Sequence, residues 1–435
     1  MRYNRSMKVY LSSIGCRLNQ SEIETLGRQL LARGHEIISD PDQADQVVIN
    51  TCAVTSSAAR DARTQTRRIH RGNPRAQIHL TGCYATVARD ELAALPGEPR
   101  VISNAQKPQL LQIMDPQAIG NSASLFDREP VLREFLHGHL GNTRAFIKVQ
   151  DGCDNRCTFC ITTIARGRGT SRPAGDIIAE IQSLSAAGYQ EALLTGVHLG
   201  SYGRDLDNGT TLGDLLRAIL TYTDIPRLRI SSLEPWDIEP DFFRIWQNPR
   251  LQPHLHLPLQ SGSDAILKRM ARRTSRAAFR SLTEAARQVI PDLNLSTDII
   301  LGFPGESEMD FEQSMDFVRE SGFSRLHAFT YSQRPGTAAA KMSDQVPPAV
   351  RKERTRLMIE LGSELSLAFH RRFEGAARPV LWEQATGADQ NGLKWAGYTD
   401  NYIRVTANGP VELFNTITPT KLSTARADGM SGTIA

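Results

Sequence analysis

The chain has 435 residues, of which 23% are charged, and its formal net charge is only +4. A chain of this length can form two or three domains, each with its own core. No stretch approaches the roughly 20 apolar residues of a membrane-spanning helix, and residues 1–6 lack the apolar core of a signal peptide. We therefore expect a cytoplasmic protein with no membrane partner, and its small basic excess permits a nucleic-acid partner without requiring one.

The first predicted domain, residues 1–125, alternates short β-rich runs with helical patterns. The β-rich runs are residues 8–11, 46–50, 77–80 and 100–103, and the helical patterns include residues 21–26 and 56–70. Strands and helices that alternate at this spacing favour an open parallel α/β sheet.

Three cysteines, Cys16, Cys52 and Cys83, follow three of these predicted strands. The loops beyond the carboxyl ends of parallel strands meet at one edge of the sheet, where such folds bind ligands. Any one of these cysteines could be an ordinary buried apolar residue. Three at equivalent strand ends, two of them directly after Gly15 and Gly82, instead favour a shared iron-sulfur cluster with one open iron.

The other three cysteines lie in one loop with the spacing Cys153-x-x-x-Cys157-x-x-Cys160. Thiolates so close in sequence are soft ligands suited to a [4Fe-4S] cluster, and without a fourth nearby cysteine one iron has no protein ligand. A structural zinc site or a chance grouping is the alternative, but zinc needs a fourth ligand and usually two Cys-x-x-Cys pairs. In a reducing compartment, metal ligation explains all six cysteines better than disulfides do.

Six further strand-like runs, separated by helical patterns, follow a predicted linker at residues 134–142 and indicate a central domain over residues 140–372. The runs are residues 145–149, 192–195, 228–231, 254–257, 295–300 and 326–330. Repeated βα units predict a barrel or a partial barrel, here with six strands. The loop of Cys153, Cys157 and Cys160 follows the first of these strands, so it is predicted to lie at the carboxyl face, where barrel enzymes place their chemistry.

Other unusual residues follow strands of the same predicted barrel. Gly196 and Gly302 would let backbone approach a ligand closely, although simple turn chemistry explains glycines equally well. Glu234 needs a partner, because a charge just past a barrel strand is costly to hold alone. Arg166 could bind an anion such as a carboxylate or an RNA phosphate, or lie in a solvated turn. The histidines His198, His254 and His256 are interpreted as polar groups of the core or of a pocket.

The predicted third domain, residues 374–435, follows a helix at residues 349–372. Its short β-rich runs are residues 379–383, 393–398, 401–405, 410–413 and 421–426, which predict a small antiparallel β-barrel. Trp382, Trp395 and Tyr402 could stack on RNA bases beside basic residues, or simply form the core of this small domain.

Four motifs together resemble the radical S-adenosylmethionine (SAM) methylthiotransferases. They are Gly15-Cys16-Arg17-Leu18-Asn19-Gln20-Ser21-Glu22, Asn50-Thr51-Cys52-Ala53-Val54-Thr55, Thr81-Gly82-Cys83-Tyr84-Ala85 and the loop of Cys153, Cys157 and Cys160. The resemblance covers nearly the whole chain, and residues 374–435 are similar to the TRAM domain, an RNA-binding module. It implies two [4Fe-4S] clusters and SAM as cofactors, and a partial (β/α)6 barrel as the central fold.

In this family the amino and carboxylate groups of one SAM bind the open iron of the central cluster, and its cleavage gives a 5′-deoxyadenosyl radical that removes a substrate hydrogen. A second SAM donates methyl to sulfur held at the auxiliary cluster. The resemblance places Phe159 near the adenine of SAM. Thr195-Gly196-Val197 departs from the Gly-Gly-Glu that many radical SAM enzymes carry, so Glu234 becomes a candidate for the SAM ammonium or hydroxyl groups.

Within the family, Cys16-Arg17-Leu18-Asn19 and the motif around Cys52 look most like the branch that adds a methylthio group to C2 of N6-threonylcarbamoyladenosine beside the tRNA anticodon. The expected partners are therefore the tRNA anticodon loop and an electron donor such as flavodoxin or ferredoxin. The alternatives are N6-isopentenyladenosine in tRNA, an aspartate of a ribosomal protein, and, in another class, a non-catalytic iron-sulfur RNA-binding protein.

Overall fold

The computed structural model describes residues 6–116, 143–389, 392–410 and 412–434, which fall into two compact units. The first unit draws on Met1–Asn155, Cys160–Gly188 and Thr195–Val197, and the second on Arg156–Phe159, Tyr189–Leu194 and His198–Ala435. The linker predicted at residues 134–142 lies outside the described residues. The three domains at residues 1–125, 140–372 and 374–435 stay a prediction.

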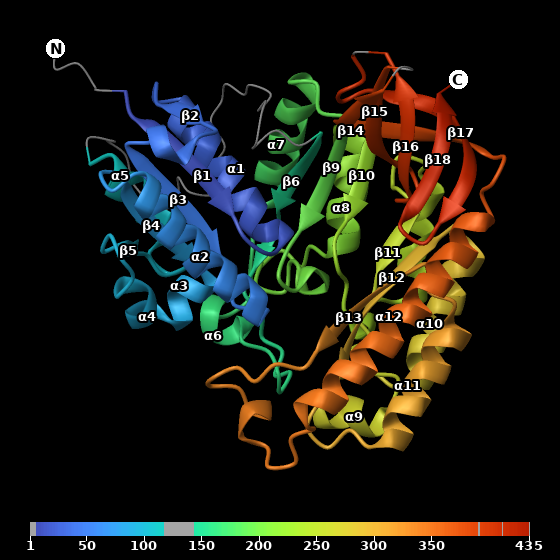
Figure 1. The fold of residues 1–435 in the computed structure, drawn as a ribbon. Coiled ribbons are helices and arrows are strands. Elements are labelled where there is room, and N and C mark those ends of the chain that lie inside the picture. The colour runs from blue at the N-terminus through green and yellow to red at the C-terminus, as the bar shows by residue number, and fades with distance from the viewer. Residues whose placement is uncertain (1–5, 117–142, 390–391, 411, 435) are drawn as a thin grey trace. The chain divides into compact units, whose positions relative to one another are not determined.

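A five-stranded sheet with the order β2-β1-β3-β4-β5 forms the centre of the first unit, and all its pairs are parallel (Figure 1). Its strands are β1 (Lys8–Ser13), β2 (Glu36–Ile38), β3 (Gln46–Thr51), β4 (Gln77–Gly82) and β5 (Arg100–Val101). The predicted open parallel α/β sheet is confirmed. The three residues of β2 were missed because so short a run carries little periodicity.

Helices cover both faces of this sheet, because each strand sends alternate side chains to opposite sides. Val9, Leu11 and Val48 pack with the apolar face of one helix group, whereas Val47 and Ile49 pack with the other. The first group is α1 (Arg17–Leu31) and α5 (Leu110–Met114), and the second is α2 (Ser56–Gly72), α3 (Cys83–Val87) and α4 (Arg89–Ala93). The connections between strands and helices therefore end at one common edge of the sheet.

The rest of the first unit precedes and follows the central cysteine loop in the sequence. Its elements are β6 (Arg144–Lys148), β7 (Gln150–Asp151), α6 (Thr162–Arg166), β8 (Thr170–Ser171) and α7 (Ala174–Ala186). The short strands β7 and β8 pair antiparallel and flank the loop on its two sides in sequence. The helix α6 begins two residues after Cys160 and has only five residues.

The second unit holds a parallel α/β region in which β9 pairs with β10, and β12 pairs with both β11 and β13. These strands are β9 (Glu191–Thr195), β10 (Arg227–Ile230), β11 (His254–His256), β12 (Asn294–Leu301) and β13 (Arg325–Thr330). Together with β6, they match the six predicted strands, and the parallel α/β class of the central region is confirmed.

The helices of this region are α8 (Leu212–Tyr222), α9 (Asp264–Arg269), α10 (Arg276–Val289), α11 (Glu308–Ser321) and α12 (Pro348–Arg371). The segment between β11 and β12 holds two helices, α9 and α10, instead of one continuous helix. Ala271 has a φ of +55°, which interrupts the helix. Ser275 then starts α10, because its hydroxyl accepts a hydrogen bond from the amide of Ala278. None of the helices in the described residues is long and apolar enough to cross a membrane.

A closed five-stranded barrel follows α12, with the order β14-β15-β16-β18-β17 (Figure 1). Its strands are β14 (Ala377–Asp389), β15 (Gly392–Thr399), β16 (Arg404–Gly409), β17 (Ile417–Arg426) and β18 (Gly429–Ile434). The barrel is confirmed, but residues 410–413, predicted as a strand, contribute none at their described positions, and β18 was missed. The pairs are antiparallel except β16–β18, which is parallel and closes the barrel.

Polar contacts fasten this barrel to the amino ends of the central strands. Arg227, the first residue of β10, donates to the carbonyl oxygens of Pro379 (2.8 Å) and Tyr398 (3.2 Å). Asn294, the first residue of β12, donates to the carbonyl of Asn401 (2.8 Å). The barrel thus lies at the end of these strands opposite to their carboxyl ends.

Candidate metal centres

The carboxyl edge of the five-stranded sheet holds Cys16, Cys52 and Cys83. Cys16 precedes the first residue of α1, Cys52 follows the last residue of β3, and Cys83 is the first residue of α3, directly after β4. The edge predicted from the alternation of strands and helices is therefore where all three lie. Their role as metal ligands stays a prediction.

Close packing and electrostatics bring these three sulfurs into one neighbourhood. Gly15 has a φ of +106°, and a Cβ atom there would lie 2.7 Å from the sulfur of Cys52, so the backbone before Cys16 packs directly against Cys52. Burial raises the pKa of the Cys52 thiol to about 11, and the charges of the neighbouring sulfurs of Cys16 and Cys83 contribute to that rise. An unliganded Cys52 is therefore a neutral thiol at pH 7, and a bound cation would be needed to deprotonate it.

Backbone amides point at the sulfurs of three of the six cysteines with the same local geometry. In each case the amide of the residue two positions later donates to the sulfur at 3.4 Å: Val54 to Cys52, Asn155 to Cys153 and Thr162 to Cys160. An N–H donor stabilises the thiolate form of a cysteine, which is the form that binds metal.

Cys83 receives side-chain donors instead. The Nε of Arg166 lies 3.2 Å from its sulfur, and the amide nitrogen of Asn104 lies 3.8 Å away. The remaining donors of Arg166 reach Glu22 (2.9 Å), Asp151 (2.9 Å) and the side-chain oxygen of Asn19 (2.8 Å). This buried side chain, only 2% exposed, lies beside Cys83, and its predicted contact with a SAM carboxylate or an RNA phosphate stays a prediction.

Glu22 is the centre of the buried charges around Arg166. Its carboxylate also accepts from Lys107 (2.6 Å) and from the side-chain amide of Asn50 (2.9 Å). Burial alone would raise the pKa of Glu22, but the charges of Arg166, Lys107 and Lys148 hold that pKa well below its usual range. Glu22 is therefore ionised at neutral pH and fixes the surrounding cations in place.

The segment around Cys157 is anchored in the second unit. The backbone amide of Thr158 donates to the carbonyl of Met270 (3.0 Å), and its carbonyl accepts from the amide of Ala339 (2.8 Å). Phe159 packs against an apolar cluster that includes Phe303 and Tyr331, two residues that follow β12 and β13. Residues 156–159 therefore lie near the carboxyl ends of these two strands within the second unit, and the assignment of Phe159 to adenine stays a prediction.

Arg272 links Cys157 to Glu234 in the second unit. Its guanidinium lies 3.7 Å from the sulfur of Cys157 and donates to the carboxylate of Glu234 at 2.6 Å. The same guanidinium stacks on Trp236, 4.4 Å from the ring centroid. The partner that the Glu234 charge requires is therefore Arg272, within this chain; a contact between Glu234 and SAM stays a prediction.

The candidate residues at the ends of β9 and β12 make close contacts within the protein. A Cβ atom on Gly196, which follows Thr195 at the end of β9, would lie 3.1 Å from the side chain of Gln150. Gly302 has a φ of +71°, and a Cβ there would overlap the side chain of Arg351 at 2.0 Å. Packing thus requires glycine at position 302 whether or not a ligand approaches.

The three histidines interpreted above as polar groups of the core or of a pocket are hydrogen-bonded within the protein. His198 pairs with Asp237, while His254 and His256 both contact the hydroxyl of Ser296.

Sequence reasoning missed Lys107 and Arg272, because each acts through a partner far away in the chain. A local spacing could have indicated that Glu22 contacts the same partner as Asn19. Glu22 follows Asn19 by three residues in α1, so the two side chains lie on one face of the helix. No comparable spacing points to Lys107 or to Arg272.

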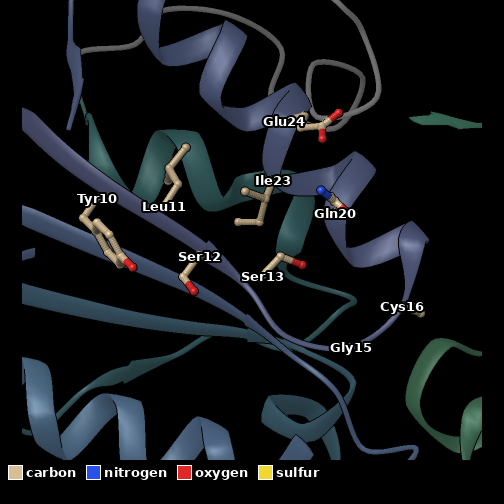
Figure 2. A pocket seen from close by; sticks show the side chains of 9 residues that line it. All are labelled: Tyr10, Leu11, Ser12, Ser13, Gly15, Cys16, Gln20, Ile23 and Glu24. Atoms are coloured by element: carbon tan, nitrogen blue, oxygen red, sulfur yellow. The ribbon is translucent and has the colours of Figure 1, made fainter. Parts of the chain in front are cut away.

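A small polar pocket of about 230 Å³ opens beside Cys16 (Figure 2). One side is made by Ser12 and Ser13 of β1, the other by Gln20 of α1, and Cys16 lies at its edge on the connecting loop. Of the three cysteines at this sheet edge, Cys16 therefore borders solvent-accessible space, whereas Cys52 and Cys83 are buried.

The donors in both cysteine sets are of the type that an iron-sulfur cluster binds, because thiolates are its usual ligands. In the described parts of the chain, no three His, Cys, Asp or Glu side chains converge as one metal ion would require. A [4Fe-4S] cluster instead binds each cysteine through a different iron, so its sulfur ligands need not converge on one point. Three thiols per set and N–H donors to their sulfurs match such a cluster with one open iron.

Two family profiles match the chain. Residues 8–103 match the family described as "Uncharacterized protein family UPF0004", and residues 147–318 match the radical SAM superfamily. The second match includes the loop of Cys153, Cys157 and Cys160. The central region is thus that of a radical SAM enzyme, a class that uses a [4Fe-4S] cluster and SAM.

Curated relatives specify the family more narrowly. Threonylcarbamoyladenosine tRNA methylthiotransferase MtaB of Bacillus subtilis (strain 168) is 34% identical, over 95% of this chain and 93% of its own. The protein of the same name from Chlamydia pneumoniae is 35% identical, over 98% and 97%. A tRNA-2-methylthio-N(6)-dimethylallyladenosine synthase of Staphylococcus aureus (strain Newman) is 32% identical, over 99% and 88%. The chain belongs to the radical SAM methylthiotransferases.

Among solved structures, the radical SAM methyltransferase TsrM from Kitasatospora setae, with cobalamin and a [4Fe-4S] cluster bound, is similar in fold. Its TM-score is 0.56 at 14% identity, over 77% of each chain. The similarity agrees with the parallel α/β architecture described above.

Proposed function

We propose that this enzyme adds a methylthio group to C2 of N6-threonylcarbamoyladenosine, next to the anticodon of tRNA. The observation that carries the proposal is the presence of two cysteine triads, each at the carboxyl ends of parallel strands and each supplied with N–H donors. A methyltransferase or a simple binding protein needs no second open cluster.

The cluster ligands follow from these triads. Cys153, Cys157 and Cys160 would hold the cluster that binds SAM, and Cys16, Cys52 and Cys83 would hold an auxiliary [4Fe-4S] cluster. Bound clusters and SAM supply reductive cleavage of SAM, hydrogen removal from the substrate carbon, and sulfur with its methyl group.

The chain's own residues have a positioning role in this proposal. The amides of Val54, Asn155 and Thr162 would each donate a hydrogen bond to a sulfur that ligates a cluster. The Arg272 guanidinium holds Glu234 within reach of the loop, and Glu234 is still 21% exposed, so it can accept a further donor such as a SAM hydroxyl or ammonium group.

For the RNA, we propose contacts through cations and backbone rather than through the barrel's tryptophans. Trp382 and Trp395 are 0% and 5% exposed, and their ring N–H groups donate to Thr418 and Pro410. These two rings form the barrel core, so they cannot stack on bases. The target adenosine lies in a single-stranded loop, where a base can leave the stack at low cost. A flavodoxin or a ferredoxin is the proposed electron donor.

N6-Isopentenyladenosine (dimethylallyladenosine) in tRNA is the second candidate substrate. The Staphylococcus aureus relative named for that nucleoside is 32% identical to this chain, close to the 34% and 35% of relatives named for threonylcarbamoyladenosine. The first candidate is preferred because of Cys16-Arg17-Leu18-Asn19 and because those relatives have the higher identity.

The number of clusters is tested by iron and sulfide analysis of the anaerobically reconstituted chain. We expect about eight irons per chain, and about four after alanine replacement of either complete triad. About four irons in the unaltered chain would contradict the second cluster.

The substrate is tested with anaerobic reactions on two tRNA samples, one carrying threonylcarbamoyladenosine and one carrying dimethylallyladenosine. The expected product, seen by mass spectrometry of nucleosides, is methylthio-threonylcarbamoyladenosine alone. Methylthiolation of only the dimethylallyl sample would overturn the preferred substrate and select the second one.

A further inference from the structure

Arg166 occupies an unusual position among the buried charges of the first unit. It is the last residue of α6, the five-residue helix that begins two residues after Cys160. Its side chain nevertheless reaches Cys83, which belongs to the other triad. Asn104 makes a parallel link, because its amide donates to the carbonyl of Ala165 (2.8 Å) and approaches the sulfur of Cys83 (3.8 Å). The short helix is therefore tied to one auxiliary cysteine by two side chains.

The need to neutralise the carboxylates of Glu22 and Asp151 does not by itself explain why Arg166 is buried here. Glu22 has a second cation, Lys107, at 2.6 Å, and Asp151 has Lys148 at 3.7 Å. Both carboxylates would thus keep a positive partner without Arg166. Two contacts of Arg166 are not duplicated by these lysines: one guanidinium N–H donates to the side-chain oxygen of Asn19 at 2.8 Å, and Nε lies 3.2 Å from the sulfur of Cys83. The carboxylates instead fix the guanidinium so that Nε faces the sulfur.

We infer that Arg166 is a positioning residue of the auxiliary cluster, which it serves by donating an N–H hydrogen bond to the Cys83 thiolate. This inference rests on the proposed function, since it needs Cys83 to be a cluster ligand. An N–H donor stabilises the added negative charge of a reduced cluster more than it stabilises the oxidised form, so it raises the reduction potential. Arg166 therefore makes the auxiliary cluster easier to reduce.

The test uses the full chain with Cys153→Ala, Cys157→Ala and Cys160→Ala, so that only the auxiliary triad can hold a cluster. Arg166→Lys keeps a positive charge near Glu22 but removes the Nε–H donor, and Arg166→Gln removes the charge as well. The control is Arg168→Gln, two residues along the chain, because that side chain is 95% exposed and pairs only loosely with Asp154 at 3.7 Å. Iron content, circular dichroism and a redox titration followed by electron paramagnetic resonance are measured for each.

We expect both Arg166 variants to lower the equilibrium constant for one-electron reduction of the cluster about tenfold. This change corresponds to a midpoint potential about 59 mV more negative than that of the parent. Arg168→Gln should keep the midpoint of the parent. A folded, iron-loaded Arg166→Lys with the parent's midpoint would overturn the inference while leaving the second cluster intact. If the parent with three alanines folds but holds no iron, the proposed auxiliary cluster fails instead, and the inference falls with it.

Discussion

Replacing Gly15 by alanine should distort the auxiliary triad without changing any proposed ligand. The residue has a φ of +106°, which alanine adopts only at a cost of about 1–3 kcal/mol. In addition, the new Cβ would lie 2.3 Å from the Cβ and 2.7 Å from the sulfur of Cys52, so Cys52 must move. Such overpacking costs a further 1–3 kcal/mol or so.

Gly34→Ala separates these two effects. Gly34 lies in the same unit with a φ of +81°, but a Cβ there would meet nothing within 4 Å. It carries the backbone strain without the collision, so Gly15→Ala should be less stable than Gly34→Ala by roughly 1–3 kcal/mol. All four tryptophans of the chain lie in the second unit, so fluorescence would miss this change.

Amide hydrogen exchange over β3 and Cys52, measured by mass spectrometry on the metal-free chain, reports the first unit directly. Exchange in Gly15→Ala should be faster than in Gly34→Ala, and after reconstitution only Gly15→Ala should lose auxiliary iron. Equal exchange in the two variants, together with full iron in both, would refute the close packing of Gly15 on Cys52.

Three further predictions concern stability. Arg354→Ala leaves the carboxylate of Glu306 buried without its 2.8 Å partner, so it should lower the free energy of unfolding by about 3–5 kcal/mol, measured by calorimetry. The control Arg356→Ala, on the exposed face of the same helix, should leave the melting temperature unchanged. Equal melting temperatures of the two variants would contradict the prediction for Arg354. Trp382→Ala should destabilise the barrel by about 3–5 kcal/mol, because the ring is fully buried. A smaller loss of unfolding free energy in urea denaturation would contradict the role of this ring in the barrel core. Burial, then the charge of a nearby arginine, lowers the pKa of His79 to about 4 from 6.5. The unfolded chain therefore binds the extra proton between these values, so stability should fall by up to roughly 3 kcal/mol from pH 6.5 to 4, and His79→Gln should flatten that slope in hydrogen exchange.

Local patterns were sufficient for most strands of the first sheet and of the central region, and for the edge on which Cys16, Cys52 and Cys83 lie. The pattern works because each cysteine directly follows a strand, and parallel strands share one carboxyl edge. It failed at residues 410–413, whose composition suits a strand although the barrel uses β18 instead.

The surroundings of the sulfurs could not be predicted in the same way. Cys83 and Arg166 are 83 positions apart, and Cys157 and Arg272 are 115 positions apart. Only the folded chain brings such pairs together, and neither arginine stands in a repeating pattern that would mark it as buried. A ligand was the predicted partner of Glu234, because nothing near Glu234 in the sequence points to Arg272. In the structure that partner is Arg272.

The attachment of the terminal barrel to the amino ends of β10 and β12 sets a minimum length for any ligand that touches both ends of the second unit. The eight residues of β12 span about 26 Å. A single nucleoside cannot bridge that distance. A ligand that contacts both the barrel and the carboxyl ends of these strands must therefore be at least that long.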